Sequence, residues 1–141
     1  MTHKTYKGKI GKLPSHGIFV FGSNPEGRHG KGAALDAKLN HGAIYGQGYG
    51  RQGRSYAIAT KDLRKKVHPS ISVEEIEDQI RTLYKYATEY DELDFYIIYD
   101  GTSPNLNNYS NEEMAKMFAC ADIPENIIFE ETFYELIKEI V

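Results

Sequence analysis

The sequence predicts an α/β domain with a largely parallel sheet and helices on both faces of that sheet. Short apolar runs bounded by turn residues alternate with longer segments in which apolar residues recur at helical spacing. Strands that alternate with helices favour parallel pairing, because parallel neighbours need crossover connections. A length of 141 residues fits a single domain over residues 1–141 and is too short for two independent cores.

Four apolar runs predict the strands, at residues 17–21, 56–60, 95–99 and 126–129. Ligands of parallel sheets gather at the carboxyl ends of the strands. Three loops leave those ends, at residues 22–32, 61–71 and 100–109. We therefore expect any binding site to be built from these three loops.

Capping boxes and apolar periodicity predict the helices. A box, in which Glu follows a hydroxyl residue by three positions, opens at Ser72, Ser110 and Thr132. After each of them, apolar residues recur on one helical face. A further helix is expected over about residues 31–39.

Charge is divided unevenly along the chain. Residues 1–66 hold 13 Lys and Arg against 3 Asp and Glu, a net charge of +10, whereas residues 67–141 hold 4 against 17, a net charge of −13. Cations that share a segment with many glycines suit an anionic ligand, because backbone N–H groups and fixed positive charge act together on phosphate. The alternative is two solvated faces that neutralise each other in the fold.

A glycine-rich stretch at residues 21–34 joins the first predicted strand to a helix. Gly30 and Gly32 would let a phosphate approach the backbone at the positive N-terminus of that helix. The alternative is a tight turn whose glycines serve geometry alone, although such a turn does not call for Asn24, His29 and Lys31. The ligand-binding residues predicted here are Gly22, Ser23, Asn24, His29, Gly30, Lys31, Gly32 and Ala33.

A second glycine-rich stretch, at residues 46–53, contains a literal GxGxxG. It precedes a strand and opens no helix, so it is not a dinucleotide-binding fingerprint. Gln47 and Tyr49 are candidates for a wall over the ligand, with either Tyr45 or Tyr49 stacking on a ring of the ligand. A glycine-rich hairpin without a ligand role is the alternative.

Lys61 and Asp100 each end a predicted strand. A lysine held partly dry there acts as a nucleophile when its pKa is lowered, whereas most lysines at such positions simply face solvent. Asp100 would orient a water or a ribose hydroxyl, or it serves only as a turn former ahead of Gly101. Further candidate ligand contacts in that loop are Gly101, Thr102 and Asn105.

Other classes of site are not expected. Cys120 stands alone, and no histidines or cysteines show zinc-ligand spacing, so neither a disulfide, a metal site nor a cofactor is predicted. No apolar run is long enough to cross a bilayer, and the opening six residues lack the apolar stretch of a signal peptide, so we expect a cytoplasmic protein. A pI of 5.9 opposes broad binding to nucleic acid. No oligomeric state is predicted.

Several of these motifs resemble the macrodomain superfamily, whose members bind and process ADP-ribose. Residues 8–13 look like its opening Gly-Asp-Ile-Thr-x-Leu, although Lys9 stands where the family has the aspartate that receives the adenine amine. The match is closer to a small macro-like family of bacteria and phages. It is carried by Phe-Gly-Ser-Asn at 21–24, His-Gly-Lys-Gly-Ala-Ala at 29–34, Tyr-Gly-Gln-Gly at 45–48 and Thr-Lys-Asp-Leu at 60–63.

The resemblance implies a three-layer α/β/α fold with a mixed, mostly parallel sheet. It also implies binding of ADP-ribose or a related phosphorylated nucleotide, with hydrolysis at the terminal ribose or processing of ADP-ribose-1''-phosphate. Lys61 would be the catalytic lysine, Asn24 would contact the distal ribose, and Asp100 is the nearest candidate for the partner acid. The macromolecular partner would be a protein or DNA that carries ADP-ribose. If a phage encodes the chain, the protein would act in the cytoplasm of the bacterial host. The alternative is a non-catalytic module that sequesters a nucleotide signal.

Overall fold

The computed structural model describes residues 3–141 of the chain. Met1 and Thr2, which open the segment expected to lack a signal peptide, lie outside them. Within the described residues the elements are β1 (Thr5–Tyr6), β2 (Gly17–Ser23), α1 (Gly32–Asn40), β3 (Gly50–Gln52), β4 (Ser55–Ala59), α2 (Val73–Glu89), β5 (Asp94–Ile97), α3 (Asn111–Phe118), β6 (Ile127–Glu130) and α4 (Glu131–Ile140). None of these helices has the length and apolar character to span a membrane.

All strands of the described chain belong to one mixed, mostly parallel sheet in the order β1-β6-β5-β2-β4-β3. The long strand β2 lies in the middle and pairs in parallel with β4 on one side and β5 on the other. β6 is parallel to both β5 and β1. Only β3 runs against its neighbour, β4. The predicted α/β class with a largely parallel sheet is confirmed.

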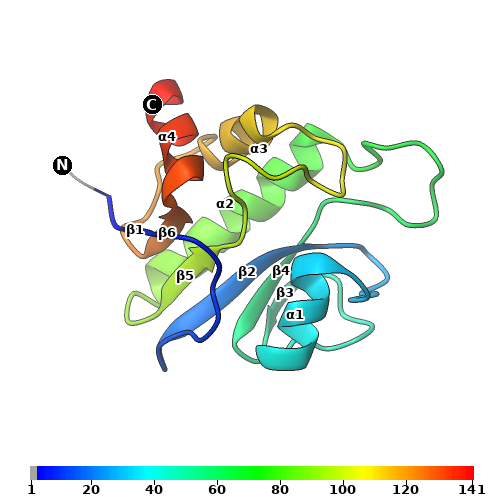
Figure 1. The fold of residues 1–141 in the computed structure, drawn as a ribbon, viewed down its shortest axis with the longest axis horizontal. Coiled ribbons are helices and arrows are strands. Elements are labelled where there is room, and N and C mark those ends of the chain that lie inside the picture. The colour runs from blue at the N-terminus through cyan, green and yellow to red at the C-terminus, as the bar shows by residue number, and fades with distance from the viewer. Residues whose placement is uncertain (1–2) are drawn as a thin grey trace.

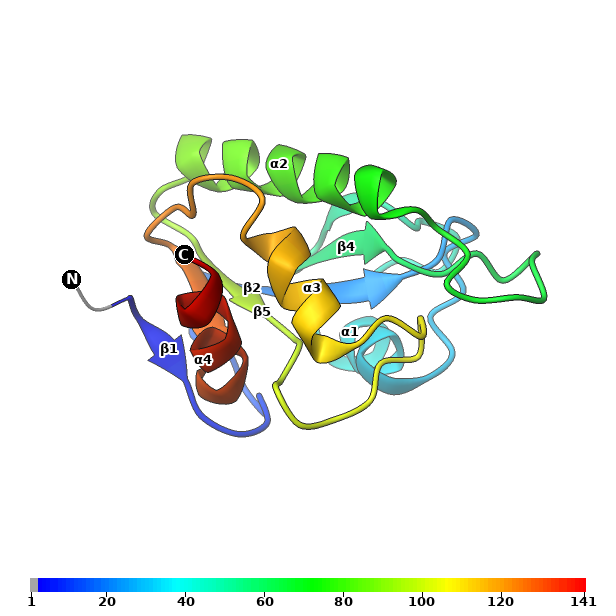
Figure 2. The same cartoon turned by 90° about the horizontal axis from the view of Figure 1, so that it is seen from above.

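Helices cover both faces of the sheet, as Figures 1 and 2 show. Alternate residues of β2 point to opposite faces. Ile18 and Val20 pack in a core with α2, α3 and α4, while Phe19 and Phe21 pack in a smaller core beneath α1. The prediction of helices on both faces is therefore confirmed, and the arrangement is that of a three-layer α/β/α fold.

Local capping explains where α2 and α3 begin. The Ser72 hydroxyl accepts a hydrogen bond from the Glu75 N–H at 3.2 Å. Ser110 and Glu113 form the full reciprocal box, with distances of 2.8 and 3.0 Å. Both predicted starts are confirmed.

The prediction that α4 opens at Thr132 was wrong, because Glu130 occupies the capping position instead. The Glu130 carboxylate accepts hydrogen bonds from the N–H groups of Thr132 and Phe133 at 2.9 and 3.0 Å. The helix therefore starts at Glu131, directly after β6. The short strands β1 and β3 were not predicted, and β5 ends two residues before the predicted boundary at Tyr99.

Candidate functional site

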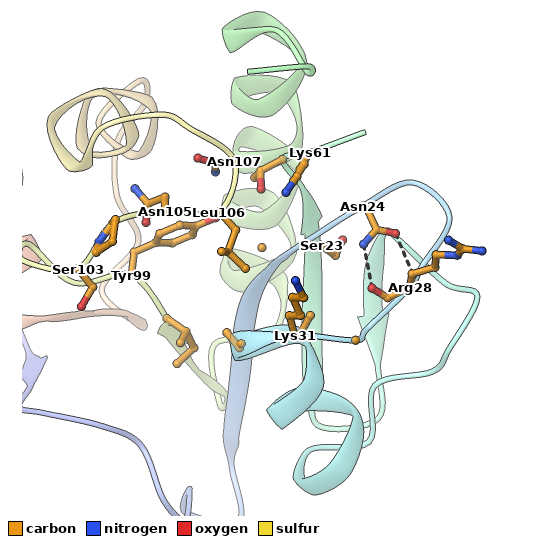
Figure 3. A pocket seen from close by; sticks show the side chains of 18 of the residues that line it. Ser23, Asn24, Arg28, Lys31, Lys61, Tyr99, Ser103, Asn105, Leu106 and Asn107 are labelled. Carbon is orange, nitrogen blue, oxygen red and sulfur yellow. Dashed lines mark hydrogen bonds between the residues drawn. The ribbon is translucent and has the colours of Figure 1, made fainter. Parts of the chain in front are cut away.

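A cavity of about 600 Å³ lies at the carboxyl ends of β2, β4 and β5 (Figure 3). The three loops that follow those strands form its wall, as the sequence predicts. The lining residues are 22–24, 28 and 30–34 after β2, 60, 61 and 63 after β4, and 98–100 and 103–107 after β5.

The start of α1 presents free backbone donors to this cavity. Lys31 is the N-cap residue but makes no side-chain capping bond, and the first turn contains no acidic residue. The first N–H groups of a helix lack intrahelical partners and carry partial positive charge. Beside them, a Cβ added at Gly30 would meet nothing within 4 Å, so the backbone is open to an approaching group. Gly32 has a φ of +57°, a conformation that favours glycine.

The side chains of the cavity wall add positive charge. Arg28, Lys31 and Lys61 line it, against a single carboxylate, that of Asp100. Figure 3 shows Lys31 and Lys61 on opposite walls, one at the start of α1 and the other after β4. None of the three cations forms an ion pair with any part of residues 3–141. The cavity therefore carries unneutralised positive charge.

The side chains of Asn24 and Ser23 are committed to the protein's own backbone. The Asn24 amide donates to the Arg28 carbonyl at 2.9 Å and accepts from the Arg28 N–H at 2.8 Å. The Ser23 hydroxyl donates to the carbonyl of Gly48. Both residues reach the cavity wall, but Asn24 is only 7% exposed and acts mainly to hold the shape of its loop.

Asp100 forms the turn that follows β5. Its Oδ1 accepts hydrogen bonds from the N–H groups of Thr102 and Ser103 at 2.8 and 2.6 Å and from the Thr102 hydroxyl at 3.2 Å. Partial burial alone would raise the pKa of Asp100, but the bonds from Ser103 and Thr102 outweigh it and lower that pKa. The carboxylate is consequently a weaker base than an ordinary aspartate, and its role as a turn former is confirmed.

Tyr99 is a cavity residue that the sequence did not reveal. Burial raises the pKa of its phenol to about 12, although the neighbouring Thr60 hydroxyl opposes the change. The phenol therefore stays protonated near neutral pH and is available to donate a hydrogen bond. A Cβ at Gly22 would lie 2.4 Å from the Tyr99 hydroxyl, which places that hydroxyl against the end of β2.

Five predicted ligand contacts lie away from this cavity. His29 is completely buried behind the loop, and its Nε2 lies 3.1 Å from the Gln47 carbonyl. Gln47 and Tyr49 belong to the segment that leads into the β3–β4 hairpin and do not line this cavity. Gly101 packs against the start of α4, where its N–H donates to the Thr132 hydroxyl at 2.8 Å. The fifth of these predicted contacts is Thr102, whose N–H and hydroxyl both donate hydrogen bonds to Asp100 Oδ1.

The loop after β5 supplies the rest of the wall. Asn105 lines the cavity, but its amide donates to the Tyr109 carbonyl at 3.0 Å and to the Asn111 side chain at 2.9 Å. Leu106 is 62% exposed, and its Cδ1 would lie 3.6 Å from a Cβ added at Gly32. This loop therefore closes the cavity opposite α1. Besides the predicted contacts, the cavity is lined by Arg28, Ala34, Thr60, Leu63, Ile98, Tyr99, Ser103, Pro104, Leu106 and Asn107.

Of these additional lining residues, Arg28 could have been predicted from the sequence, since it lies inside the glycine-rich stretch between the predicted contacts Asn24 and His29.

Among residues 3–141 no group of three His, Cys, Asp or Glu side chains is arranged to hold a metal ion. Comparison of the chain with protein-family models, curated proteins and solved structures gave no match.

Proposed function

We propose that the chain binds ADP-ribose, or a related phosphorylated nucleotide derivative, in the cavity at the carboxyl ends of β2, β4 and β5. The observation that carries this proposal is that Arg28, Lys31 and Lys61 line the same cavity as the start of α1, whose first amides have no side-chain cap. A diphosphate is a compact dianion, and helix N-termini with nearby cations are the usual protein partners of phosphate. The resemblance of residues 21–34 to a macro-like family supports the same ligand class.

The size and composition of the cavity suit such a ligand. A volume of about 600 Å³ falls within the range of about 300–1,000 Å³ typical of small-molecule sites. Apolar groups such as Ile98, Leu63 and Leu106 lie beside the polar ones and offer a surface for the base or ribose rings. Calorimetric titration with ADP-ribose tests the binding. Adenosine, which lacks phosphate, should bind far more weakly, and absence of heat at millimolar ADP-ribose would remove the proposal.

A matched pair of variants tests the charge argument. Lys31 and Lys38 lie at opposite ends of α1, and only Lys31 lines the cavity. Lys31→Gln should weaken ADP-ribose binding by about tenfold, since a solvated ion pair at about 4 Å is worth one to a few kcal/mol. Lys38→Gln should bind as the wild type does. Equal affinity of both variants and the wild type would contradict the assignment of the phosphate site.

Hydrolysis of the bond at the terminal ribose is a second candidate function, and the position of Lys61 supports it. This side chain reaches the cavity half-buried and without an ion-pair partner in the described chain, as a nucleophilic amine would. Against it stand Asp100, whose Oδ1 is occupied by its own turn, and Asn24, whose amide is occupied by its own loop. Binding without turnover is therefore the form of the proposal that the geometry favours.

Two substitutions of Lys61 separate the candidates. Lys61→Arg keeps the positive charge but removes the primary amine, so it should preserve binding and abolish any release of ADP-ribose from modified DNA or protein. Lys61→Ala should weaken binding as well. If wild type and both variants release ADP-ribose at the same rate as buffer, the hydrolase candidate is excluded while the binding proposal stands.

A further inference from the structure

The phosphate loop, which we define as residues 24–32, rests directly on the backbone of residues 44–50. The Gly46 N–H donates to the Gly27 carbonyl at 2.9 Å. A Cβ at Gly27 would lie 2.3 Å from the Gln47 nitrogen, and a Cβ at Gly48 would lie 2.1 Å from the Asn24 carbonyl oxygen. The two segments therefore pack main chain against main chain, with no room for side chains between them.

His29 fastens this contact from inside the phosphate loop. It stands between Arg28 and Gly30, which both line the cavity, yet its own side chain is 0% exposed. The ring lies edge-on to Phe21 of β2, with ring centres 5.2 Å apart. Its Nε2 lies 3.1 Å from the Gln47 carbonyl and 3.2 Å from Oε1 of Gln52.

The neighbours of Gln52 determine which nitrogen of His29 carries the proton. Gln52 Oε1 accepts a hydrogen bond from the Ile44 N–H at 2.7 Å, and its Nε2 donates to the Gln47 carbonyl at 3.1 Å, which fixes the orientation of the amide. Both atoms facing His29 Nε2 are then acceptors. Nε2 must donate, and the buried Nδ1, which has no hydrogen-bond partner in the described chain, carries the lone pair.

We propose that His29 is a positioning residue for anion binding: its Nε2–H bonds to Gln47 and Gln52 hold the phosphate loop in the conformation in which Arg28 and Gly30 line the cavity. His29 itself does not touch the ligand. The effect of His29 on affinity for ADP-ribose rests on the proposed function. The conformation of the loop can be tested without any ligand.

The binding test compares a variant that loses the donor with one that keeps it. His29→Leu removes the Nε2–H, whereas the side-chain N–H₂ of His29→Gln reaches a similar position. If His29→Leu lowers the population of the competent loop to about one tenth, the apparent Kd for ADP-ribose rises about tenfold. His29→Gln should recover most of the affinity. The matched control is His41→Leu, since His41 is also buried, at 6% exposure, but stacks on Phe19 away from the cavity.

Unchanged affinity in His29→Leu would overturn the inference, and so would an equal loss in His29→Leu and His41→Leu, which would indicate general destabilisation. Amide hydrogen exchange provides the ligand-free test. In His29→Leu the amides of residues 26–32 should exchange at least tenfold faster than in the wild type, while those in the middle of α2 keep their rates. Equal acceleration in both regions would also overturn it.

A measurement on the wild type covers the case in which His29→Leu does not fold. The nitrogen chemical shifts of the His29 ring should show the proton on Nε2, and they should not move when ADP-ribose is added. A ring protonated on Nδ1 would refute the bonding scheme. If the wild type fails to bind ADP-ribose, the proposed function falls, and ring tautomer and amide exchange still decide the role of His29 in the loop.

Discussion

Replacement of Gly48 by alanine tests whether the phosphate loop and residues 44–50 are packed main chain against main chain. The new Cβ would lie 2.1 Å from the Asn24 carbonyl oxygen, 2.8 Å from the Pro25 oxygen and 2.9 Å from the Pro25 carbonyl carbon. All three are backbone atoms, so the contact cannot be relieved by a side-chain rotation. One of the two segments has to move by about 1 Å, which is the distortion that overpacking in a dense interior produces.

The expected cost follows from two contributions. Overpacking destabilises by about 1–3 kcal/mol, and loss of the Ser23 to Gly48 hydrogen bond adds about 1 kcal/mol. A gain of about 0.4–1 kcal/mol from the less flexible unfolded chain offsets part of this. The free energy of unfolding should therefore fall by about 1–4 kcal/mol. At an unfolding entropy of about 2.1 cal/mol/K per residue, Tm should fall by roughly 3–12 °C.

Gly30 provides the matched control, because it lies in the same glycine-rich loop. A Cβ there would meet nothing within 4 Å, and its φ is outside the left-handed region. Gly30→Ala should therefore be neutral or stabilise by up to about 1 kcal/mol. Urea denaturation followed by circular dichroism measures both variants, with stability read from the midpoint at constant slope. Equal midpoints for Gly48→Ala and Gly30→Ala would refute the packing of the two segments.

Three further outcomes follow from the structure. Affinity for ADP-ribose should fall by about tenfold between 0.05 and 0.5 M salt, because the site charges are partly solvated; a salt-independent Kd would contradict the electrostatic account. The hydrogen bond from the Arg64 side chain lowers the pKa of Asp62 from 3.8 to about 2, so its stabilising contribution is present above pH 4 and is lost as the pH falls toward 2. Asp62→Asn should flatten that part of the stability profile in acid titrations, and an unchanged profile would contradict it. Ser110→Ala removes the capping box of α3 and should cost about 1 kcal/mol in urea denaturation, whereas Ser15→Ala, at an exposed position, should cost less than about 0.5 kcal/mol; equal midpoints would contradict the cap.

The elements that were predicted well are those specified by neighbouring residues. The starts of α2 and α3 depend on hydrogen bonds between residues three positions apart. Ser72 and Ser110 could therefore be recognised as the capping residues from the sequence alone. The start of α4 could not, because Glu130 and Thr132 are both acceptable caps and only the end of β6 decides between them. The strand β1 is two residues long and pairs with residues 129 and 130, so nothing local distinguishes it.

The candidate site shows the same division. That three loops meet at the carboxyl ends of parallel strands follows from the fold class, and the cavity lies there. Which side chains face it could not be predicted, because their partners come from elsewhere in the chain. His29 turns inward since Gln47 and Gln52 accept its N–H. Tyr99 reaches the wall because β5 ends at Ile97, earlier than its apolar pattern suggests.

The central claim is that backbone amides at the start of α1 receive a phosphate. Nitrogen–proton NMR spectra recorded during titration with ADP-ribose, and separately with inorganic pyrophosphate, test it directly. The account predicts saturable shifts of the Gly30, Gly32 and Ala33 amides with both anions, and no comparable shifts with adenosine. The account would be contradicted if the amide signals of α1 did not shift at millimolar ADP-ribose, or if the shifted signals all belonged to another surface.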